Sequence, residues 1–336
     1  MKQRDSLLDI IRVTACLMVV LMHSPLPSAN ANGPFLSALS YLTAPCIGLF
    51  FMVSGALLMP VKDDCFTFLR RRLSKIIVPT MAWTAIYLAL KIYYSESEIN
   101  IIQSALSIPF SPQGHGVLWF MYTLTGLYLL APILSAWVEK AKDREVEFVL
   151  ILWGITLLFP LVENYLTIVS GTTSILYYFT GYAGYFLLGY YFKHRSVHLP
   201  VAIPIAVGTI GLMLVPILKC LGVGYDFYRL FWYESIFIAA MCCAIWMFIN
   251  RVFRNHICWS IMGRLSNLTF GVYLCHILIM RYWIWKMAWI HSIPNYALQT
   301  LIIFILTSCL SFLLVEMLSR IPLIHNLIGY KTAWKK

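Results

Sequence analysis

The first residues that could carry out chemistry are Arg12 and His23, both embedded in the apolar stretch 7–24. An ionisable side chain at the centre of a membrane span costs about 2.5–3.5 kcal/mol on insertion scales, so it needs a partner or a wet cavity. The two residues are eleven positions apart, just over three helical turns, so they project from one face about 16 Å apart along the axis. That face offers a fixed cation near one end and, deeper in, an imidazole suited to general base catalysis.

Both residues also have a purely structural interpretation. An arginine near the end of a span can serve as a membrane anchor whose head reaches the interface. A single histidine within a span can pack between helices or lie at the interface. Their common face favours a functional role without excluding these alternatives.

A second cluster of possible chemistry is the basic run FLRRRLSKIIVP, which places Arg70, Arg71, Arg72 and Lys75 before an apolar stretch. Guanidinium groups form forked hydrogen bonds that suit phosphate, so the run is a candidate site for a phosphate-bearing ligand from the cytosol. The same run also fits a cluster of charges that fixes the orientation of the chain in the membrane. The two interpretations are compatible.

Other polar residues in the apolar stretches have simpler explanations. Ser54 precedes Gly55, and small residues of this kind let helices pack closely. Trp119 fits a belt of aromatic side chains at the membrane surface. Glu316 and Arg320 are four residues apart, which is the spacing of an ion pair on one helix face.

The composition decides what kind of protein must position these residues. The chain has 336 residues, of which 60% are hydrophobic and 12% charged, whereas soluble domains are about 45–50% apolar and about 25% charged. This excludes a soluble protein. The net charge of +11 is then explained by basic cytoplasmic loops rather than by nucleic-acid binding.

The apolar stretches predict an all-α integral membrane protein of about ten transmembrane helices around a polar central cavity. With the N-terminus in the cytoplasm, most of the 25 Lys and Arg fall on the cytoplasmic side, which predicts that both termini are cytoplasmic. We expect one membrane-embedded domain over 1–336 with no appended soluble domain. The predicted spans are 7–24, 36–59, 76–94, 117–137, 147–168, 172–192, 201–221, 230–249, 266–286 and 297–318.

Several chemistries are absent from the sequence. The nine Cys include no C-x-x-C pair and lie mostly in apolar runs, so neither a disulfide framework nor a zinc site is expected, and no metal cofactor is predicted. The chain has no nucleophile elbow, zinc-protease, Walker or dinucleotide-binding motif. Soluble hydrolase and nucleotide-hydrolysing machinery are therefore not expected.

The chain resembles the acyltransferase-3 family of integral membrane acyltransferases. The resemblance begins with LLDIIRVTACLMVVLMHS, in which ten residues separate Arg12 from His23, and continues in order through FFMVSGALL, FLRRRLSKIIVP, LWFMYTLTGLYLLAPIL, YFLLGYYF and LSNLTFGVYLCHILI. A chain of this length is similar to the surface-glycan O-acetyltransferases of the enterobacterial common antigen type. One departure is that Glu316 and Pro322 are separated by MLSRI, where the family often has Glu, a basic residue and Pro.

The resemblance implies transfer of an acetyl or similar small acyl group from cytosolic acetyl-CoA to a hydroxyl of a cell-surface glycan or its lipid-linked precursor. It implies His23 as the general base, assisted by Arg12, and phosphate binding by Arg70, Arg71, Arg72 and Lys75. Second-rank candidates for lining the cavity or orienting His23 are Ser54, Trp119, Tyr128, His276 and Glu316. The implied location is the bacterial cytoplasmic membrane, with membrane lipids and the glycan acceptor as partners and no nucleic acid.

Two other functions remain open at this point. A transporter of glycans or lipid-linked sugars could use the same polar cavity without an acyl donor, and a membrane scaffold could hold the buried Arg and His for packing. The combination of an inner basic cluster with Arg12 and His23 on one face argues against both. The acceptor, the identity of the acyl group and the existence of an acyl-histidine intermediate are not determined by the sequence.

Overall fold

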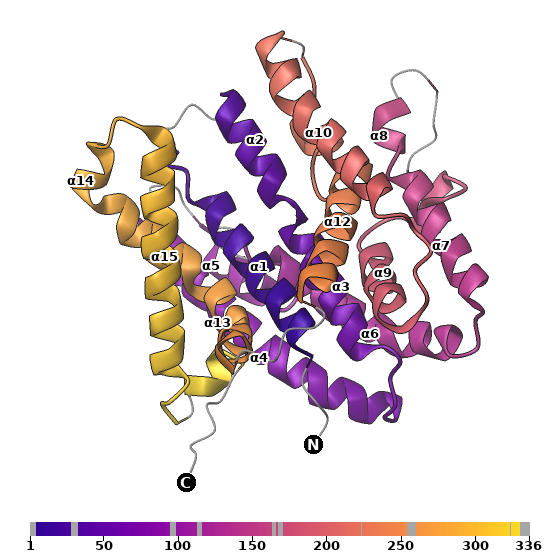
Figure 1. The fold of residues 1–336 in the computed structure, drawn as a ribbon. Helices are drawn as coiled ribbons and strands as arrows, with labels where there is room; N and C mark the ends of the chain where they lie inside the picture. The colour runs from indigo at the N-terminus through magenta and orange to yellow at the C-terminus, as the bar shows by residue number, and fades with distance from the viewer. Residues whose placement is uncertain are drawn as a thin grey trace. The chain divides into compact units, whose positions relative to one another are not determined.

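The computed structural model describes residues 5–27, 33–94, 99–112, 116–162, 166, 171–222, 224–253, 260–322 and 324–329. Every regular element within these ranges is a helix (Figure 1). Nine helical segments of the described residues are long and apolar enough to cross a membrane. The predicted all-α integral membrane fold is confirmed.

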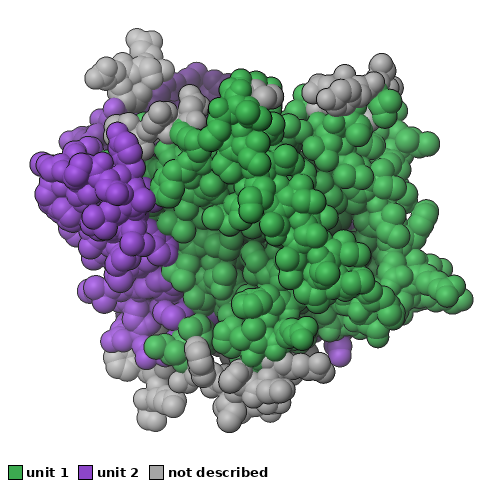
Figure 2. All heavy atoms as spheres, turned by 45° about the horizontal axis from the view of Figure 1, so that its top comes forward, with its two compact units in different colours: residues 1–60, 133–263 green, residues 61–132, 264–336 purple. Residues whose placement is uncertain are grey.

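The chain forms two compact units, which Figure 2 distinguishes by colour. Unit 1 contains residues 1–60 and 133–263, and unit 2 contains residues 61–132 and 264–336. The helices of unit 1 are α1 (Ser6–His23), α2 (Pro34–Thr43), α3 (Pro45–Leu58), α7 (Asp143–Thr156), α8 (Phe159–Val162), η1 (Gly171–Thr173), η2 (Tyr177–Phe179), α9 (Ala183–His194), α10 (Ala202–Cys220), α11 (Phe227–Leu230) and α12 (Ile236–Phe253).

Unit 2 contains the long helices that follow the first 60 residues and those near the C-terminus. They are α4 (Cys65–Tyr94), α5 (Ile101–Ser107), α13 (Ser260–Tyr282, which enters unit 2 at Arg264), η3 (Ile284–Lys286), α14 (Ala288–His291), α15 (Tyr296–Leu318) and η4 (Ile324–Leu327). Helix α6 (Trp119–Val138) contributes its residues up to Pro132 to unit 2 and its last turns to unit 1.

Side-chain caps fix where several of these helices begin. The Asp5 carboxylate accepts hydrogen bonds from the backbone N–H groups of Leu7 and Leu8, at 3.1 and 3.4 Å, and so caps α1. Asn295 caps α15 in the same way. Such caps satisfy backbone donors that the first helical turn leaves unpaired.

The core of unit 1 is the close packing of α3 against α9, with α1 and α12 also in contact with α3 (Figure 1). A Cβ atom added at Gly55 would lie 1.8 Å from the carbonyl oxygen of Phe186, and one added at Gly189 would lie 1.8 Å from that of Met52. Only glycine permits backbones to approach this closely. Gly55 therefore serves helix packing, as the structural interpretation of the Ser54–Gly55 pair proposed.

Two predicted spans have different boundaries in the structure. The span predicted at 36–59 is divided into α2 and α3, with Pro45 in the first turn of α3, because proline has no N–H to continue the preceding helix. The span predicted at 76–94 begins eleven residues earlier, at Cys65. Arg, Lys and Leu are good helix formers, so the basic run belongs to α4 itself rather than to a preceding loop.

The span predicted at 172–192 is the one that is not among the nine segments of the described residues. Its regular helix, α9, has 12 residues, about 18 Å, whereas the hydrocarbon core is about 30 Å thick. Gly181 precedes α9 with a φ of 87°, a left-handed conformation that breaks a helix and favours glycine. The span was predicted from its apolar residues alone, and these do not reveal a break in the helix at Gly181.

Candidate functional site

Helix α1 carries Arg12 and His23 as the sequence predicts. Both side chains are half-buried, and both lie on a helix that packs against α2, α3 and α12. Since the helix is continuous from Ser6 to His23, the two residues share a face and are about 16 Å apart along its axis. The structure therefore places Arg12 and His23 on one helix face within unit 1, as their spacing in the sequence predicts.

The two ends of α1 lie at opposite ends of unit 1. At its start, the Asp5 carboxylate forms an ion pair with the ammonium group of Lys193, the penultimate residue of α9. The neighbouring His194 contacts the carbonyl oxygen of Ala56 near the end of α3, with 3.0 Å from Nε2 to O. We call this the basic end of unit 1.

At the other end of α1, the Tyr233 hydroxyl lies 3.6 Å from the sulfur of Met22, the residue before His23. The backbone carbonyl of Tyr233 accepts a hydrogen bond of 2.6 Å from the hydroxyl of Tyr185, in the first turn of α9. We call this the histidine end of unit 1. Helix α9 thus reaches from the histidine end to the basic end, although it is shorter than a typical span.

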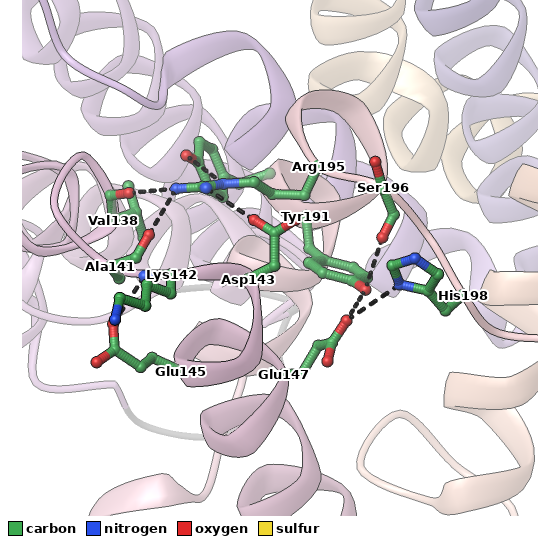
Figure 3. Close-up of polar contacts among 11 residues, drawn as sticks. Val138, Ala141, Lys142, Asp143, Glu145, Glu147, Tyr191, Arg195, Ser196 and His198 are labelled. Atoms are coloured by element: carbon green, nitrogen blue, oxygen red, sulfur yellow. Dashed lines mark hydrogen bonds and ion pairs between the residues drawn. The ribbon is translucent and has the colours of Figure 1, made fainter.

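The basic end is held together by Arg195, the residue after α9 (Figure 3). Its guanidinium group donates to the carboxylate of Asp143 at 2.8 Å and to the carbonyl oxygens of Val138 and Ala141 at 2.6 and 3.0 Å. One forked side chain thereby joins the end of α9 to the end of α6 and the start of α7. The planar guanidinium with five donors is suited to such a junction.

A second group at the same end consists of Tyr191, Glu147 and His198 (Figure 3). The Tyr191 hydroxyl donates to the Glu147 carboxylate at 2.5 Å, and His198 Nδ1 lies 3.6 Å from the same carboxylate oxygen. These groups were not identified from the sequence, because Glu147 is about fifty residues from Tyr191 and His198 in the chain. They stabilise the junction between α7 and α9.

Replacing Arg195 with lysine is expected to lower the free energy of unfolding by about 1–3 kcal/mol, because lysine keeps the charge but cannot reach three acceptors at once. Thermal unfolding of the purified protein in detergent measures the change. Arg144→Lys is the matched control, since Arg144 is exposed on the neighbouring helix α7. Equal unfolding midpoints for the two variants would show that the Arg195 junction contributes nothing.

The histidine end also contains an acidic residue that the sequence analysis did not identify. Glu234 follows Tyr233, and its carboxylate oxygen lies 3.7 Å from the position that a Cβ on Gly181 would occupy. Burial raises the pKa of the Glu234 carboxyl, although its side chain still reaches solvent. Tyr182, the residue before α9, is a neighbour of Glu234. Glu234 was not singled out from the sequence, because the aromatic residues around it make the stretch read as apolar.

The predicted phosphate-binding residues lie in unit 2, on the first turns of α4. Arg70, Arg71, Arg72 and Lys75 are all exposed. Arg71, Arg72 and Lys75 share one helix face because Lys75 follows the other two by four and three residues, whereas Arg70, five residues before Lys75, projects about 140° away from it. Arg71 also forms an ion pair of 2.9 Å with Asp63.

Trp119, Tyr128 and His276 also lie in unit 2. His276 is buried, and its Nδ1 lies 2.7 Å from the carbonyl oxygen of Tyr273. Because a carbonyl only accepts, Nδ1 carries the hydrogen in this contact. The ring of Tyr273 packs at a tilt of 59° against that of Phe120, the residue after Trp119, with 5.3 Å between ring centroids. Trp119 and His276 therefore belong to one aromatic group, whereas Tyr128 is half-buried further along α6.

Glu316 forms the ion pair with Arg320 that its spacing predicts, at 2.8 Å. It also pairs with Arg264 at 3.1 Å, which joins α15 to α13. Both arginine side chains are largely exposed, so each pair is worth about 0–1 kcal/mol. In the structure Glu316 links two helices of unit 2.

The ordered motifs and the helical architecture agree with a comparison to known protein families. A family model described as an acyltransferase domain matches residues 5–316, which is nearly the whole chain. The chain belongs to the acyltransferase-3 family. Comparisons with curated proteins and with solved structures find no match to it.

Membership of the acyltransferase-3 family, together with the apolar helices, identifies the protein as a multi-pass membrane acyltransferase. The match extends over both compact units. Arg12 and His23, which carry the first motif of the resemblance, lie inside the matched range together with all the other candidate residues. The three candidates in unit 1 are Arg12, His23 and Ser54, whose hydroxyl donates to the carbonyl oxygen of Phe50 at 2.8 Å.

Proposed function

We propose that this acyltransferase transfers an acetyl or similar small acyl group from cytosolic acetyl-CoA to a hydroxyl of a cell-surface glycan or its lipid-linked precursor. The observation that carries the proposal is the position of Arg12 and His23 on one face of α1, whose ends lie at opposite ends of unit 1. The guanidinium group of Arg12 and the imidazole of His23 therefore lie along the same face of α1. We further propose the bacterial cytoplasmic membrane as the location.

The orientation follows from charge. The basic end of unit 1 carries Lys193 and Arg195, and the nearby connection between α6 and α7 adds Lys140 and Lys142. Loops rich in Lys and Arg remain in the cytoplasm. The histidine end is then extracytoplasmic. Both termini are cytoplasmic in this arrangement if the segment containing α9 completes a crossing, because the number of crossings must be even.

The donor fits the basic residues. Coenzyme A is a cytosolic polyanion with a long, thin pantetheine arm, and forked guanidinium groups are suited to its phosphates. Arg71, Arg72 and Lys75 form one exposed face of α4, and Arg12 is the cation on the path toward His23. In our proposal Arg71, Arg72 and Lys75 bind the phosphates of the donor.

The transfer step uses His23 as a general base. Its neutral imidazole accepts the proton of the acceptor hydroxyl while the oxygen attacks the acyl carbonyl carbon. As the new ester C–O bond forms, the C–S bond of the thioester breaks, and the leaving thiolate takes the proton back from the imidazolium. A pKa near neutrality suits histidine for both halves of this exchange. Family membership favours this chemistry over the transporter and scaffold alternatives.

Binding of acetyl-CoA to the detergent-purified protein tests the donor site. Arg71→Ala and Arg72→Ala are expected to weaken binding about tenfold each, since a hydrogen bond to a charged group is worth about 1.5–3 kcal/mol. Asp63→Asn is expected to strengthen binding, because Asp63 now pairs with Arg71 and would repel phosphate. Isothermal titration calorimetry measures all three.

Arg70→Ala is the matched control, because it removes the same charge from a different face of α4. Its affinity is expected to stay closer to that of the wild type. Equal losses from all three arginine substitutions would show that the run acts only through its total charge. Absence of binding to folded wild-type protein would contradict the proposed donor.

A further inference from the structure

We infer that the segment from Tyr225 to Glu234 forms the acceptor subsite, which holds an uncharged sugar ring at the histidine end of unit 1. This inference rests on the proposed function and adds to it a class of acceptor and the residues that bind it. The segment connects α10 to α12 and contains the short helix α11. We call it the aromatic segment; its aromatic members are Tyr225, Phe227, Tyr228, Phe231, Trp232 and Tyr233.

The aromatic segment is held in place by contacts with α9, α10 and α12. Phe231 is 1% exposed and stacks on Phe237 of α12 with 5.3 Å between ring centroids. The Tyr225 hydroxyl donates to the carbonyl oxygen of Val215 in α10 at 3.2 Å. Tyr233 is buried as well, and its backbone carbonyl is bonded to Tyr185. These contacts hold the segment in one conformation against the core of unit 1.

Exposure alternates along the second half of the segment. Phe231, Tyr233 and Ser235 are buried, whereas Trp232 between them is half-buried and Glu234 is exposed. The alternation places Trp232 and Glu234 on the outward side of the segment. Tyr228, which is 70% exposed, packs edge-on against Trp232 with 5.1 Å between ring centroids. Two aromatic rings and a carboxylate therefore share one accessible surface.

This surface has the chemistry that recognises a sugar. The apolar C–H face of a sugar ring packs on an aromatic face, while a carboxylate accepts hydrogen bonds from hydroxyl groups and gives short, charge-assisted bonds. No ion pair of Glu234 is seen among the residues that the structure describes. The segment carries two exposed carboxylates, Asp226 and Glu234, and one exposed cation, Arg229. Its net charge of −1 disfavours an anionic sugar or a phosphate, so we infer an uncharged ring.

The subsite also lies in the correct place for transfer. Glu234 directly follows Tyr233, whose hydroxyl contacts Met22, and Met22 directly precedes His23. A sugar bound against Glu234 is therefore close to the end of α1 that carries the proposed base. Aromatic residues at a membrane surface can alternatively form an interfacial belt, but such a belt does not require a carboxylate among them.

The test measures binding of the methyl glycosides of glucose, galactose, mannose and rhamnose to the full-length protein in detergent, by saturation-transfer NMR. Tyr228→Ala and Glu234→Gln alter accessible side chains and are expected to weaken binding of at least one glycoside about tenfold or more. Trp289→Ala is the control, because Trp289 is a comparably exposed aromatic residue of unit 2. Glucuronic acid is expected not to compete.

Acetyl-CoA binding is measured on the same samples, so that failure of the acceptor subsite can be distinguished from failure of the proposed function. Loss of glycoside binding in Tyr228→Ala and Glu234→Gln, with acetyl-CoA binding retained, supports the subsite. Wild-type protein that binds acetyl-CoA but none of the glycosides overturns the subsite and leaves the proposed function standing. An equal loss in Trp289→Ala identifies the aromatic segment as part of a membrane belt and also overturns it. Glycoside binding without acetyl-CoA binding supports the subsite and overturns the donor.

Discussion

The His23→Ala variant is expected to transfer acyl groups about 10²–10⁴-fold more slowly than the wild type, the usual contribution of a positioned general base. Its binding of acetyl-CoA is expected to be unchanged, because the residues proposed to bind the donor phosphates, Arg71, Arg72 and Lys75, lie on another helix, α4. The rate is measured as the thiol released from acetyl-CoA in the presence of the membrane glycan fraction. A fall in the maximal rate without a change in donor affinity identifies a role in chemistry.

The matched control for this prediction is His198→Ala. His198 lies at the basic end of the same unit with its side chain 76% exposed, so its removal is expected to leave the rate within the range of the wild type. Wild-type rates in His23→Ala, or equal losses in both variants, would contradict the assignment of the base. Thermal midpoints of both variants establish that the proteins are folded.

Gly189→Ala is expected to abolish the folded state or lower its stability by about 3 kcal/mol or more. The added Cβ would lie 1.8 Å from the carbonyl oxygen of Met52 in α3. Overpacking of a core usually costs about 1–3 kcal/mol, and here the obstructing atom belongs to a helix backbone, which cannot turn aside as a side chain can. Gly55→Ala is expected to behave alike, since it meets the backbone of Phe186 at the same distance.

Gly154→Ala in α7 is the control for both glycine substitutions, because nothing lies within 4 Å of its added Cβ. Alanine favours a helix interior over glycine by roughly 0.5–1 kcal/mol, so this variant is expected to be neutral or slightly stabilised. Size-exclusion chromatography after heating compares the three proteins. If Gly189→Ala were as stable as Gly154→Ala, helices α3 and α9 would not be in the contact described.

The sequence predicts the fold well where a helix is apolar and uninterrupted. Helices α1, α10 and α15 nearly coincide with their predicted spans, because about twenty apolar residues have few alternatives in a membrane. The predictions fail where local chemistry overrides hydropathy. Pro45 divides one span, and the basic residues at the start of α4 extend another toward the N-terminus.

The candidate site is predictable only in part. The common face of Arg12 and His23 follows from their spacing alone, and so does the pair of Glu316 with Arg320. The second partner of Glu316, Arg264, is 52 residues away, so no local pattern could reveal it. Glu234 is likewise identified only by its contacts, because its neighbours Tyr182 and Tyr185 are about fifty residues earlier in the chain.

Transfer of label from radioactive acetyl-CoA tests most directly whether this membrane protein is a glycan O-acyltransferase. The donor is supplied to the cytoplasmic face of membrane vesicles that contain the full chain, and the glycan and lipid-linked sugar fractions are assayed for label released by mild alkali. We predict alkali-labile label with the wild type and only background with His23→Ala. Wild-type vesicles that bind acetyl-CoA but leave both fractions unlabelled would contradict the proposed function.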